Sequence, residues 1–575
     1  MAVYRSDQAQ LTFGFEPAPG GYAELASNAT VITGGSPGAV NGVINNSPGG
    51  YPAGTTAITV TEAAGTWVKD IDIRIGPGVN GNGVTTGESE IRRVLHVESL
   101  VLYLDAPTSF AHPHQADVDK VSSATTVAND MYITSIPGVY DTVDVPDPDM
   151  TIEPRYFLGT KNKRNYAVAL RGQQTYAGSV SGIVLLDGRP LRFPFGKVVT
   201  HTANSAAFSP ATSLAADTAK GDIFVSVDAS STLSIAANEL VVFGYVATAQ
   251  SNSTMEVRKV VSGAVSSGTT ATLQLDKPLQ FAHSNDDVLR KMSANPTYTH
   301  HIYETVDLDT VSWHVHMKDS AESATNNFDR RYYGGLIGSA SIAADEGGMV
   351  NMSWDGVNFQ GMKHNQQIKT SATNFVPHFG LMATVDNDNV EFPTTQPYFF
   401  SQGSVTMFGQ EIARIRSFSL SVSNGEEPRY YVNRRLGEKR GPSEIREGRR
   451  EYSMTASLAL PDSQGSTSTS TTLFKELLLE GGAGQAGFDV VVTFTRGTND
   501  SITIHIPGNE DTSNDQITSA AGIGTSGANA GLWQSGAIIR TAPHSITGDN
   551  PVQVDADILF RNIKIEVNDS LYYYP

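Results

Sequence analysis

The stretch RSFSLSVSN, residues 416–424, decides the fold. Phe418, Leu420 and Val422 alternate with serines, so an extended chain would place the apolar side chains on one side and the hydroxyls on the other. The same period of two recurs in SITIHI (501–506) and NIKIEV (562–567). This alternation is typical of strands with one buried face, and it predicts an all-β chain.

One stretch predicts a short α-helix within this β-rich sequence. TTLFKELLLEGG (471–482) offers Thr471 or Thr472 as an N-terminal cap and Gly481 as a C-terminal stop. The expected fold is therefore a β-sandwich or β-barrel framework with one minor helix.

The composition limits the classes of function. The 575 residues are 39% hydrophobic and 17% charged, which is typical of a chain that folds around a core. The formal net charge of −19 argues against tight binding of DNA, although an acidic protein can enclose DNA without holding it. The acidity also fits simple solubility. The chain has no cysteine, so disulfides, thiolate metal sites and a cysteine nucleophile are excluded. The N-terminus shows no signal-peptide pattern, and no apolar run is long enough to predict a membrane anchor.

Two similar segments divide the chain. LDAPTSFAH (104–112) is nearly repeated as LDKPLQFAH (275–283), and upstream EIRR (90–93) matches EVRK (256–259). Because whole sets of residues recur, His112 and His283 are expected to be structural. The repeat predicts two homologous β-barrel-like modules inserted into a larger framework. The expected divisions are an N-terminal arm at 1–47, module 1 at 48–122, framework at 123–211, module 2 at 212–292 and framework at 293–575.

Few residues suggest catalysis or metal binding. GGSPG (34–38) matches a nucleophile elbow around Ser36, but Pro37 lacks the N–H that an oxyanion hole needs and no helix is expected to follow. THHIYETVDLDTVSWHVHM (299–317) contains His300, His301, His314 and His316, which permit a metal site, although a polar strand face is the favoured interpretation. DNDN (386–389) lacks the glycine that a calcium loop requires at its sixth position. The expectation is no catalytic site, no cofactor and no metal.

A basic loop lies inside this acidic chain. Residues 433–450, NRRLGEKRGPSEIREGRR, separate two expected strands, YYV (430–432) and YSMTASLAL (452–460), and loops of this length are often functional. The loop could be a solvated hairpin tip, or it could dock on an acidic surface of another subunit such as 140–154. Its basic residues are Arg434, Arg435, Lys439, Arg440, Arg446, Arg449 and Arg450.

The sequence of the framework resembles that of the major tail tube proteins of long-tailed, siphovirus-like bacteriophages. The resemblance is carried by residues 396–432 with 441–460, by RRYYGGLIGSASIAADEGGMVNMSWDGV (330–357), by 164–199 and by AQLTFGFEPAPGG (9–21). It covers most of the chain outside the two modules. The modules and the unusual length depart from the family pattern.

The resemblance implies a structural virion protein rather than an enzyme. Such subunits form rings, commonly of six, which are assembled in the host cytoplasm and stack into the hollow tail tube. DNA passes through the lumen at genome ejection without specific binding, and the neighbours of the tube are the tail terminator, baseplate and tape-measure proteins. The basic loop would stack rings, residues 1–19 would contact a neighbouring subunit, and the modules would lie outside the tube. The expected barrel residues are Val405, Met407, Ile415, Phe418, Leu420, Ile337, Ile342, Met349 and Met352.

Two other classes of function stay open at this stage. The repeated modules could belong to a β-rich, adhesin-type surface protein that recognises host glycans. A β-sandwich hydrolase that uses Ser36 or His316 is a further alternative.

Overall fold

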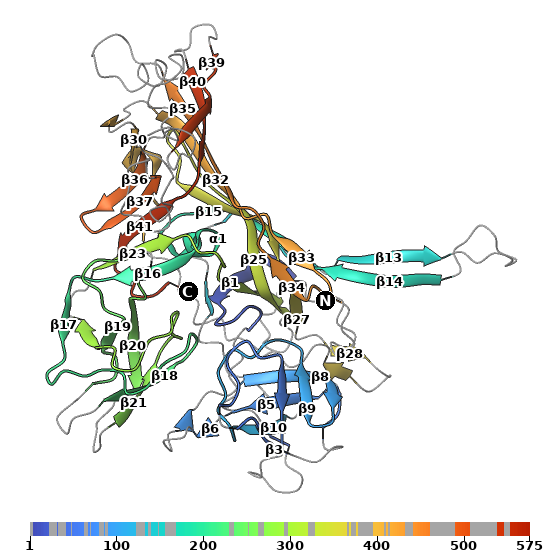
Figure 1. The fold of residues 1–575 in the computed structure, drawn as a ribbon. Helices are drawn as coiled ribbons and strands as arrows, with labels where there is room; N and C mark the ends of the chain where they lie inside the picture. Colours follow the sequence, from blue (N-terminus) through green and yellow to red (C-terminus); the bar gives the residue numbers. More distant parts are fainter. Residues whose placement is uncertain are drawn as a thin grey trace, which may run out of the picture.

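The computed structural model of the protein describes residues 4–21, 42–121, 140–155, 168–319, 328–364, 395–431, 441–459, 489–506, 537–545 and 553–574, apart from short gaps, with short strands at 31–32, 133–135, 367–369 and 375–377. Nearly all regular structure in these residues is β-strand, which confirms the all-β class (Figure 1). The described helical segments are α1 (Arg192–Phe195) and the 3-10 turns η1 (Arg189–Leu191) and η3 (Phe400–Gln402). The helix predicted at 471–482 lies outside the described residues.

The largest sheet has 13 strands and divides along the long strand β25 (Phe328–Asp345). The first half of β25 pairs with β24 (Val311–Asp319) and β27 (Gly361–His364), and β1 (Tyr4–Phe15) and β11 (Ile133–Ser135) follow beyond β24. The second half belongs to a run of eight antiparallel strands. In spatial order they are β12 (Thr142–Asp144), β15 (Ala177–Val184), β26 (Asn351–Asn358), β25, β32 (Ile415–Ser423), β35 (Glu451–Ala459), β40 (Gln553–Phe560) and β38 (Ile538–Thr541).

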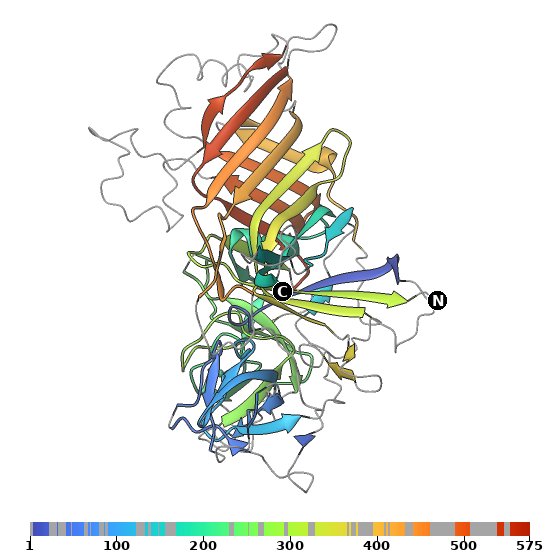
Figure 2. The same ribbon diagram turned by 90° about the vertical axis from the view of Figure 1, so that its right-hand side faces the viewer.

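A second sheet packs behind this run and closes a sandwich. Figure 2 shows the run from yellow through orange to red strands in front of the second sheet. Phe418 of β32 stacks on Phe494 with ring centroids 5.7 Å apart, so the apolar side of RSFSLSVSN lies in the core between the sheets. The order of the second sheet is β16 (Lys197–His201), β23 (Tyr298–Tyr303), β41 (Lys564–Asp569), β37 (Asp500–Ile506), β36 (Val490–Gly497), β30 (Gly403–Met407) and β31 (Gln410–Glu411).

Two smaller sheets lie at the opposite end of the molecule from the tall sandwich (Figure 1). One has seven strands and a core that includes Trp67 and Leu102, and the other has six strands and a core that includes Phe243 and Leu273. These sheets fall largely within the predicted modules, and their status as inserted units remains a prediction. The first contains β2 (Val31–Ile32), β3 (Gly42–Val43), β4 (Ala57–Thr59), β5 (Asp72–Ile75), β8 (Glu90–Glu98), β9 (Val101–Leu104) and β10 (Asp117–Val121). The second contains β17 (Ser205–Ala207), β18 (Phe224–Asp228), β19 (Leu240–Phe243), β20 (Glu256–Ser262), β21 (Thr270–Leu275) and β22 (Arg290–Met292).

The repeated motif forms the same buried network in both small sheets. In the first, Glu90 lies 2.6 Å from Arg92 Nη2 and 2.7 Å from His112 Nε2, and the backbone N–H of Ser109 donates to its carboxylate. Burial alone would raise the pKa of Glu90, but Arg92 and His112 outweigh it and hold that pKa below its usual range. This network explains why the histidine recurs.

The second small sheet repeats these contacts. Glu256 is paired with Arg258 and lies 2.8 Å from His283 Nε2, while the backbone N–H of Gln280 donates to its carboxylate at 2.8 Å. All three side chains of the Glu–Arg–His set are buried. His283, like His112, therefore has a structural role.

Candidate functional site

The face of the eight-stranded run that points away from the core is lined by small hydroxyl side chains. They come from the alternate positions of strands whose other side chains are buried, and none of them is fully buried. We call this surface the hydroxyl face. Its members are Ser179, Ser181, Ser339, Ser341, Ser353, Ser417, Ser419, Ser421, Ser423, Ser453, Thr455 and Ser457.

Strand register brings these hydroxyls into rows across the sheet. Ser341 of β25 lies opposite Ser353 on one side and opposite Ser421 on the other, and Ser421 in turn lies opposite Ser453. Four neighbouring strands therefore present serine at one level. Because the side-chain period of a strand is two, a slip of one residue would turn these serines into the core. The buried apolar side chains that alternate with these serines therefore fix the strand register, and with it the row of hydroxyls.

The charged residues at this face are mostly acidic. The basic groups here are Arg416 of β32, whose Nη1 donates to Gln553 at 3.4 Å, and Arg540 of β38, whose Nε donates to Asp557 at 2.7 Å. None of the eight described strands contains histidine, so no serine has an imidazole base beside it within the run. The arrangement offers a polar, weakly acidic surface. The acidic positions are Asp144, Asp345, Asp355, Glu451, Asp555 and Asp557.

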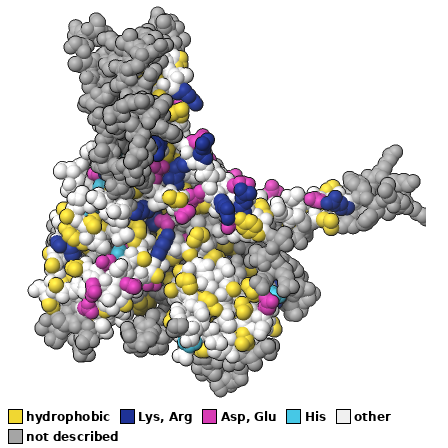
Figure 3. All heavy atoms as spheres, viewed as in Figure 1, with side chains coloured by type: hydrophobic (Ala, Val, Ile, Leu, Met, Phe, Trp, Pro, Cys, Tyr) yellow, Lys and Arg dark blue, Asp and Glu magenta, His cyan; other side chains and the backbone are white. Residues whose placement is uncertain are grey.

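A separate two-stranded arm projects from the side of the sandwich. Its strands are β13 (Asp149–Arg155) and β14 (Val168–Thr175), which pair only with each other among the described strands. Figure 3 shows the arm standing clear of the remaining surface. Ile152 is 60% exposed and Leu170 is 49% exposed. A two-stranded ribbon is marginally stable in water, so these apolar side chains are suited to contact another molecule.

The predicted ring-stacking loop is only partly described. Arg434, Arg435, Lys439 and Arg440 lie outside the described residues. The flanking chain forms a short hairpin of β33 (Glu427–Arg429) and β34 (Glu444–Arg446), so the strand that precedes the loop ends before Tyr430 rather than containing it.

The three remaining arginines of that loop have different surroundings. Arg446 and Arg449 are exposed, and Arg446 Nε also pairs with Glu444 of the same hairpin. Arg450 is engaged within the subunit, because its Nε donates to Asn424 at 2.9 Å and its Nη1 lies 3.4 Å from Glu304. Arg446 and Arg449 are therefore the described loop arginines that a neighbouring subunit could reach.

The expected barrel residues occupy both sheets. Met349 lies in the turn after β25, bridges to Phe399 and is 40% exposed. Most of the others point into the core between the sheets. The serines and threonines that alternate with them were not among the residues predicted from the sequence to line the barrel. The signal for those positions was present as the serines of RSFSLSVSN. Val405 and Met407 lie on β30 in the second sheet, whereas Ile337, Ile342, Met352, Ile415, Phe418 and Leu420 lie on β25, β26 and β32.

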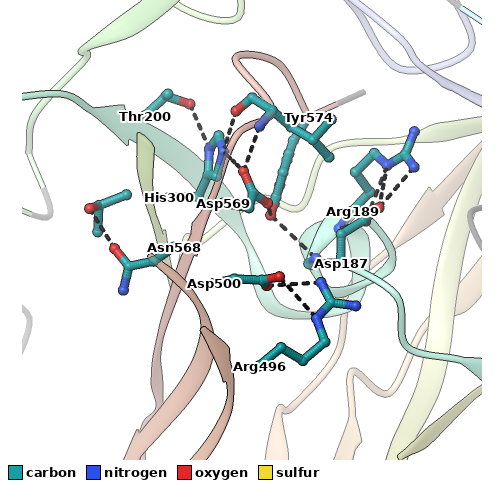
Figure 4. A network of polar contacts seen from close by, with 12 residues as sticks. Asp187, Arg189, Thr200, His300, Arg496, Asp500, Asn568, Asp569 and Tyr574 are labelled. Carbon is teal, nitrogen blue, oxygen red and sulfur yellow. Dashed lines mark hydrogen bonds and ion pairs between the residues drawn. The ribbon is translucent and has the colours of Figure 1, made fainter. Parts of the chain in front are cut away.

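The histidines considered as metal ligands have different partners. His300 is buried, accepts or donates one hydrogen bond with Thr200 at 3.0 Å, and lies 3.2 Å from Asp569 and 3.8 Å, centroid to centroid, from the ring of Tyr574 (Figure 4). This network fixes the end of the chain to β16 and β23. Within the described part of the chain, no group of three histidine, aspartate or glutamate side chains is arranged to hold a metal ion. The side chain of His316 lies outside the described set.

Several sequence motifs also fall outside what the structure describes. Ser36 of GGSPG and the DNDN segment at 386–389 are among them. Among the described helices, none has the length and apolar character required to cross a membrane.

Comparison with known proteins identifies a family. A model of the family described as phage tail tube protein matches residues 5–558. The match spans both small sheets and most of the sandwich, and β41 lies beyond it. No curated protein matches the chain.

Proposed function

This chain belongs to the phage tail tube protein family, whose members are structural proteins of the virion tail, and we propose that it self-assembles into closed rings that stack into the hollow tube for DNA delivery. The observation that carries this proposal is the eight-stranded run with its single open face. Among the described strands, β12 pairs only with β15, and β38 pairs only with β40. Both ends of the run are therefore sheet edges, which pairing with neighbouring chains would remove.

We propose that the hydroxyl face lines the lumen. The opposite side of the run is covered by the second sheet, so closure of the ring leaves only this face toward the centre. Small hydroxyls keep water at the wall, and the acidic positions repel the phosphates of DNA. DNA would then slide past without specific binding, and the proposal requires neither a cofactor nor catalysis.

Two features would connect one ring to the next. The β13–β14 arm carries exposed apolar side chains on a ribbon that is long enough to leave its own subunit. The basic loop at 433–450 supplies the second contact, with Arg446 and Arg449 exposed at its described end. The acidic segment 140–154, which includes β12 and most of β13, is a suitable partner for the basic loop.

The two small sheets would lie outside the tube. They lie at one end of the sandwich, where the second of them packs against β16 and β23, and the lumen would be blocked if they filled it (Figure 1). Tail terminator, baseplate and tape-measure proteins would contact the ends and the interior of the assembled tube. The siphovirus-like type of tail and assembly in the host cytoplasm remain part of this proposal.

The test is the assembly state of the purified chain. Sedimentation and negative-stain electron microscopy at increasing concentration are expected to show rings and hollow tubes. A protein that stays monomeric at high concentration would contradict the proposal.

A further inference from the structure

The eight-stranded run is built from two four-strand units with the same topology. Unit A consists of β12, β15, β25 and β26 in chain order, and their spatial order is β12-β15-β26-β25. Unit B consists of β32, β35, β38 and β40, and their spatial order is β32-β35-β40-β38. Each unit therefore places its first, second, fourth and third strands side by side.

The connections between strands also match. A hairpin joins the first strand to the second in both units, β13–β14 in unit A and β33–β34 in unit B. The chain then crosses to the second sheet, where β16 pairs with β23 in unit A and β36 pairs with β37 in unit B, before it returns for the third strand. In unit A the second small sheet lies between β16 and β23, and β24 precedes the third strand. Shared spatial order together with shared crossovers is a strong constraint, because many other connections of four strands are possible.

The pairing lengths agree as well. In unit A the second and fourth strands pair from Val184 with Asn351 to Ala177 with Asn358, with register shifts on either side of Val180 that unit B lacks. In unit B they pair from Ala459 with Gln553 to Tyr452 with Phe560. Both fourth strands have eight residues, and in both units the second and fourth strands pair over the full length of the fourth.

From this duplication we infer that one chain supplies two of the wall units of a ring, so that three chains, rather than six, close the tube. The inference rests on the proposed function and refines its ring number. The six units expected from the family resemblance would then come from three copies of units A and B. A single six-unit ring built from six whole chains would leave one of these two units without a place in the wall.

The junction inside one chain predicts the junction between chains. Units A and B meet where β25 pairs with β32, that is, where a third strand meets a first strand. The free ends of the run are a third strand, β38 with its continuation β39 (His544–Ser545), and a first strand, β12. A neighbouring chain can therefore repeat the β25–β32 pairing with its β12 against β38 and β39.

Side chains at the free edges suit this pairing. Val143 of β12 and Ile539 of β38 are only partly buried against the core, and a neighbour would complete their burial. Asp144 and Arg540 are exposed and opposite in charge. The pairing would thus bury apolar surface and bring complementary charges to the rim of the contact.

The register can be carried over from unit to unit. Ser545 pairs with Gln553, the first residue of its fourth strand, as Ala343 pairs with Asn351. Ala343 in turn lies opposite Ser419 on β32. The corresponding contact between chains places Ser545 of one chain near Asp144 on β12 of the next.

Two measurements test the inference on the full chain. The first is native mass spectrometry of isolated rings, which is expected to give three times the chain mass of 61.4 kDa. Six chains per ring would overturn the inference while leaving the proposed function intact. Absence of rings would overturn the proposed function and this inference with it.

The second measurement uses cysteine crosslinking, because the chain has no cysteine of its own. The double variant Asp144→Cys with Ser545→Cys, treated with a flexible bismaleimide after assembly, is expected to give a ladder that ends at three chains. Each single variant should give no ladder. The control Ala343→Cys with Ser419→Cys should crosslink within one chain and keep the mobility of a monomer. A ladder that continues to six chains, or none from the double variant when rings form, would contradict the inference.

Discussion

Ser341 on β25 and Ser421 on β32 are direct antiparallel partners at the seam between the two halves of the eight-stranded run. Residues 80 positions apart in the chain thus continue one row of hydroxyls without a break, since Ser353 and Ser453 extend the row on either side. A seam of this kind lets two units act as one wall. The hydroxyl face is therefore a property of the joined sheet and not of either half alone.

A positive charge on this face should hinder DNA passage. Ser421→Lys is expected to leave the fold and assembly intact, because the position is solvent-facing, but to slow DNA release several-fold through attraction to phosphate. The measurement is the rate of DNA ejection from particles that carry the variant. Val306→Lys is the control, since Val306 is 91% exposed and lies outside the eight-stranded run. Equal ejection rates for both variants would contradict the proposal that the hydroxyl face lines the lumen.

Charges on the apolar side chains of the arm should block stacking. The double variant Ile152→Asp with Leu170→Asp is expected to change the free energy of unfolding of the subunit by roughly 0.5 kcal/mol or less, because both side chains are exposed. It should give rings without tubes in electron micrographs. Val288→Asp is the matched control, because Val288 is 56% exposed and lies beside the six-stranded small sheet, and this variant should form tubes. Normal tubes from the double variant would show that the arm is not the stacking contact.

The buried carboxylates of the repeated networks should be important for stability. Glu256→Gln leaves Arg258 without a buried counter-charge and removes the carboxylate partner of His283, and breaking a buried pair in this way costs about 3–5 kcal/mol. Glu90→Gln should have a similar effect, because the same contacts surround it. Thermal unfolding monitored by circular dichroism checks both variants.

The control for these two variants is an exposed ion pair. Glu153 and Arg155 pair on the surface of the arm, so Glu153→Gln should cost about 1 kcal/mol or less. If Glu90→Gln and Glu256→Gln were no more damaging than Glu153→Gln, the networks would not have the stabilising role assigned here.

Glu16 should make stability depend on pH near neutrality. Burial raises its pKa from 4.5 to about 7, although the backbone N–H groups of Gly20 and Gly334 donate to its carboxylate at 2.9 Å. The folded state therefore holds a proton that the unfolded state releases, so stability falls as pH rises from 4.5 to 7 and the loss is complete above 7. Each unit of pKa shift corresponds to about 1.4 kcal/mol.

The measurement is the melting temperature as a function of pH. Glu16→Gln cannot ionise and is expected to flatten the slope between pH 4.5 and 7. An unchanged slope in the variant would show that another group titrates in this window.

The sequence predicted the elements with a strong period of two and missed the features that depend on pairing between distant strands. The alternation in RSFSLSVSN correctly placed Phe418, Leu420 and Val422 in the core. It also contained the hydroxyl face, but only the register of Ser341 with Ser421 shows that the serines of separate strands share one surface. The choice of barrel residues therefore favoured apolar positions.

The two kinds of repeat differ in how visible they are in sequence. The Glu–Arg–His motif recurs with the same amino acids, because a buried ion pair tolerates few other residues. Units A and B share strand order rather than side chains, since many apolar residues fill a sandwich core equally well. The second repeat could only be found from the pairing of β12 through β38.

The central claim is that the hydroxyl face lines a tube built by this chain. A cryo-electron microscopy reconstruction of the assembled, purified protein tests it most directly. The account predicts a hollow tube with Ser341 and Ser421 on the lumen wall and with β12 of one chain beside β38 and β39 of the next. A tube that carries these serines on its outer surface, or a chain that never assembles, would contradict it.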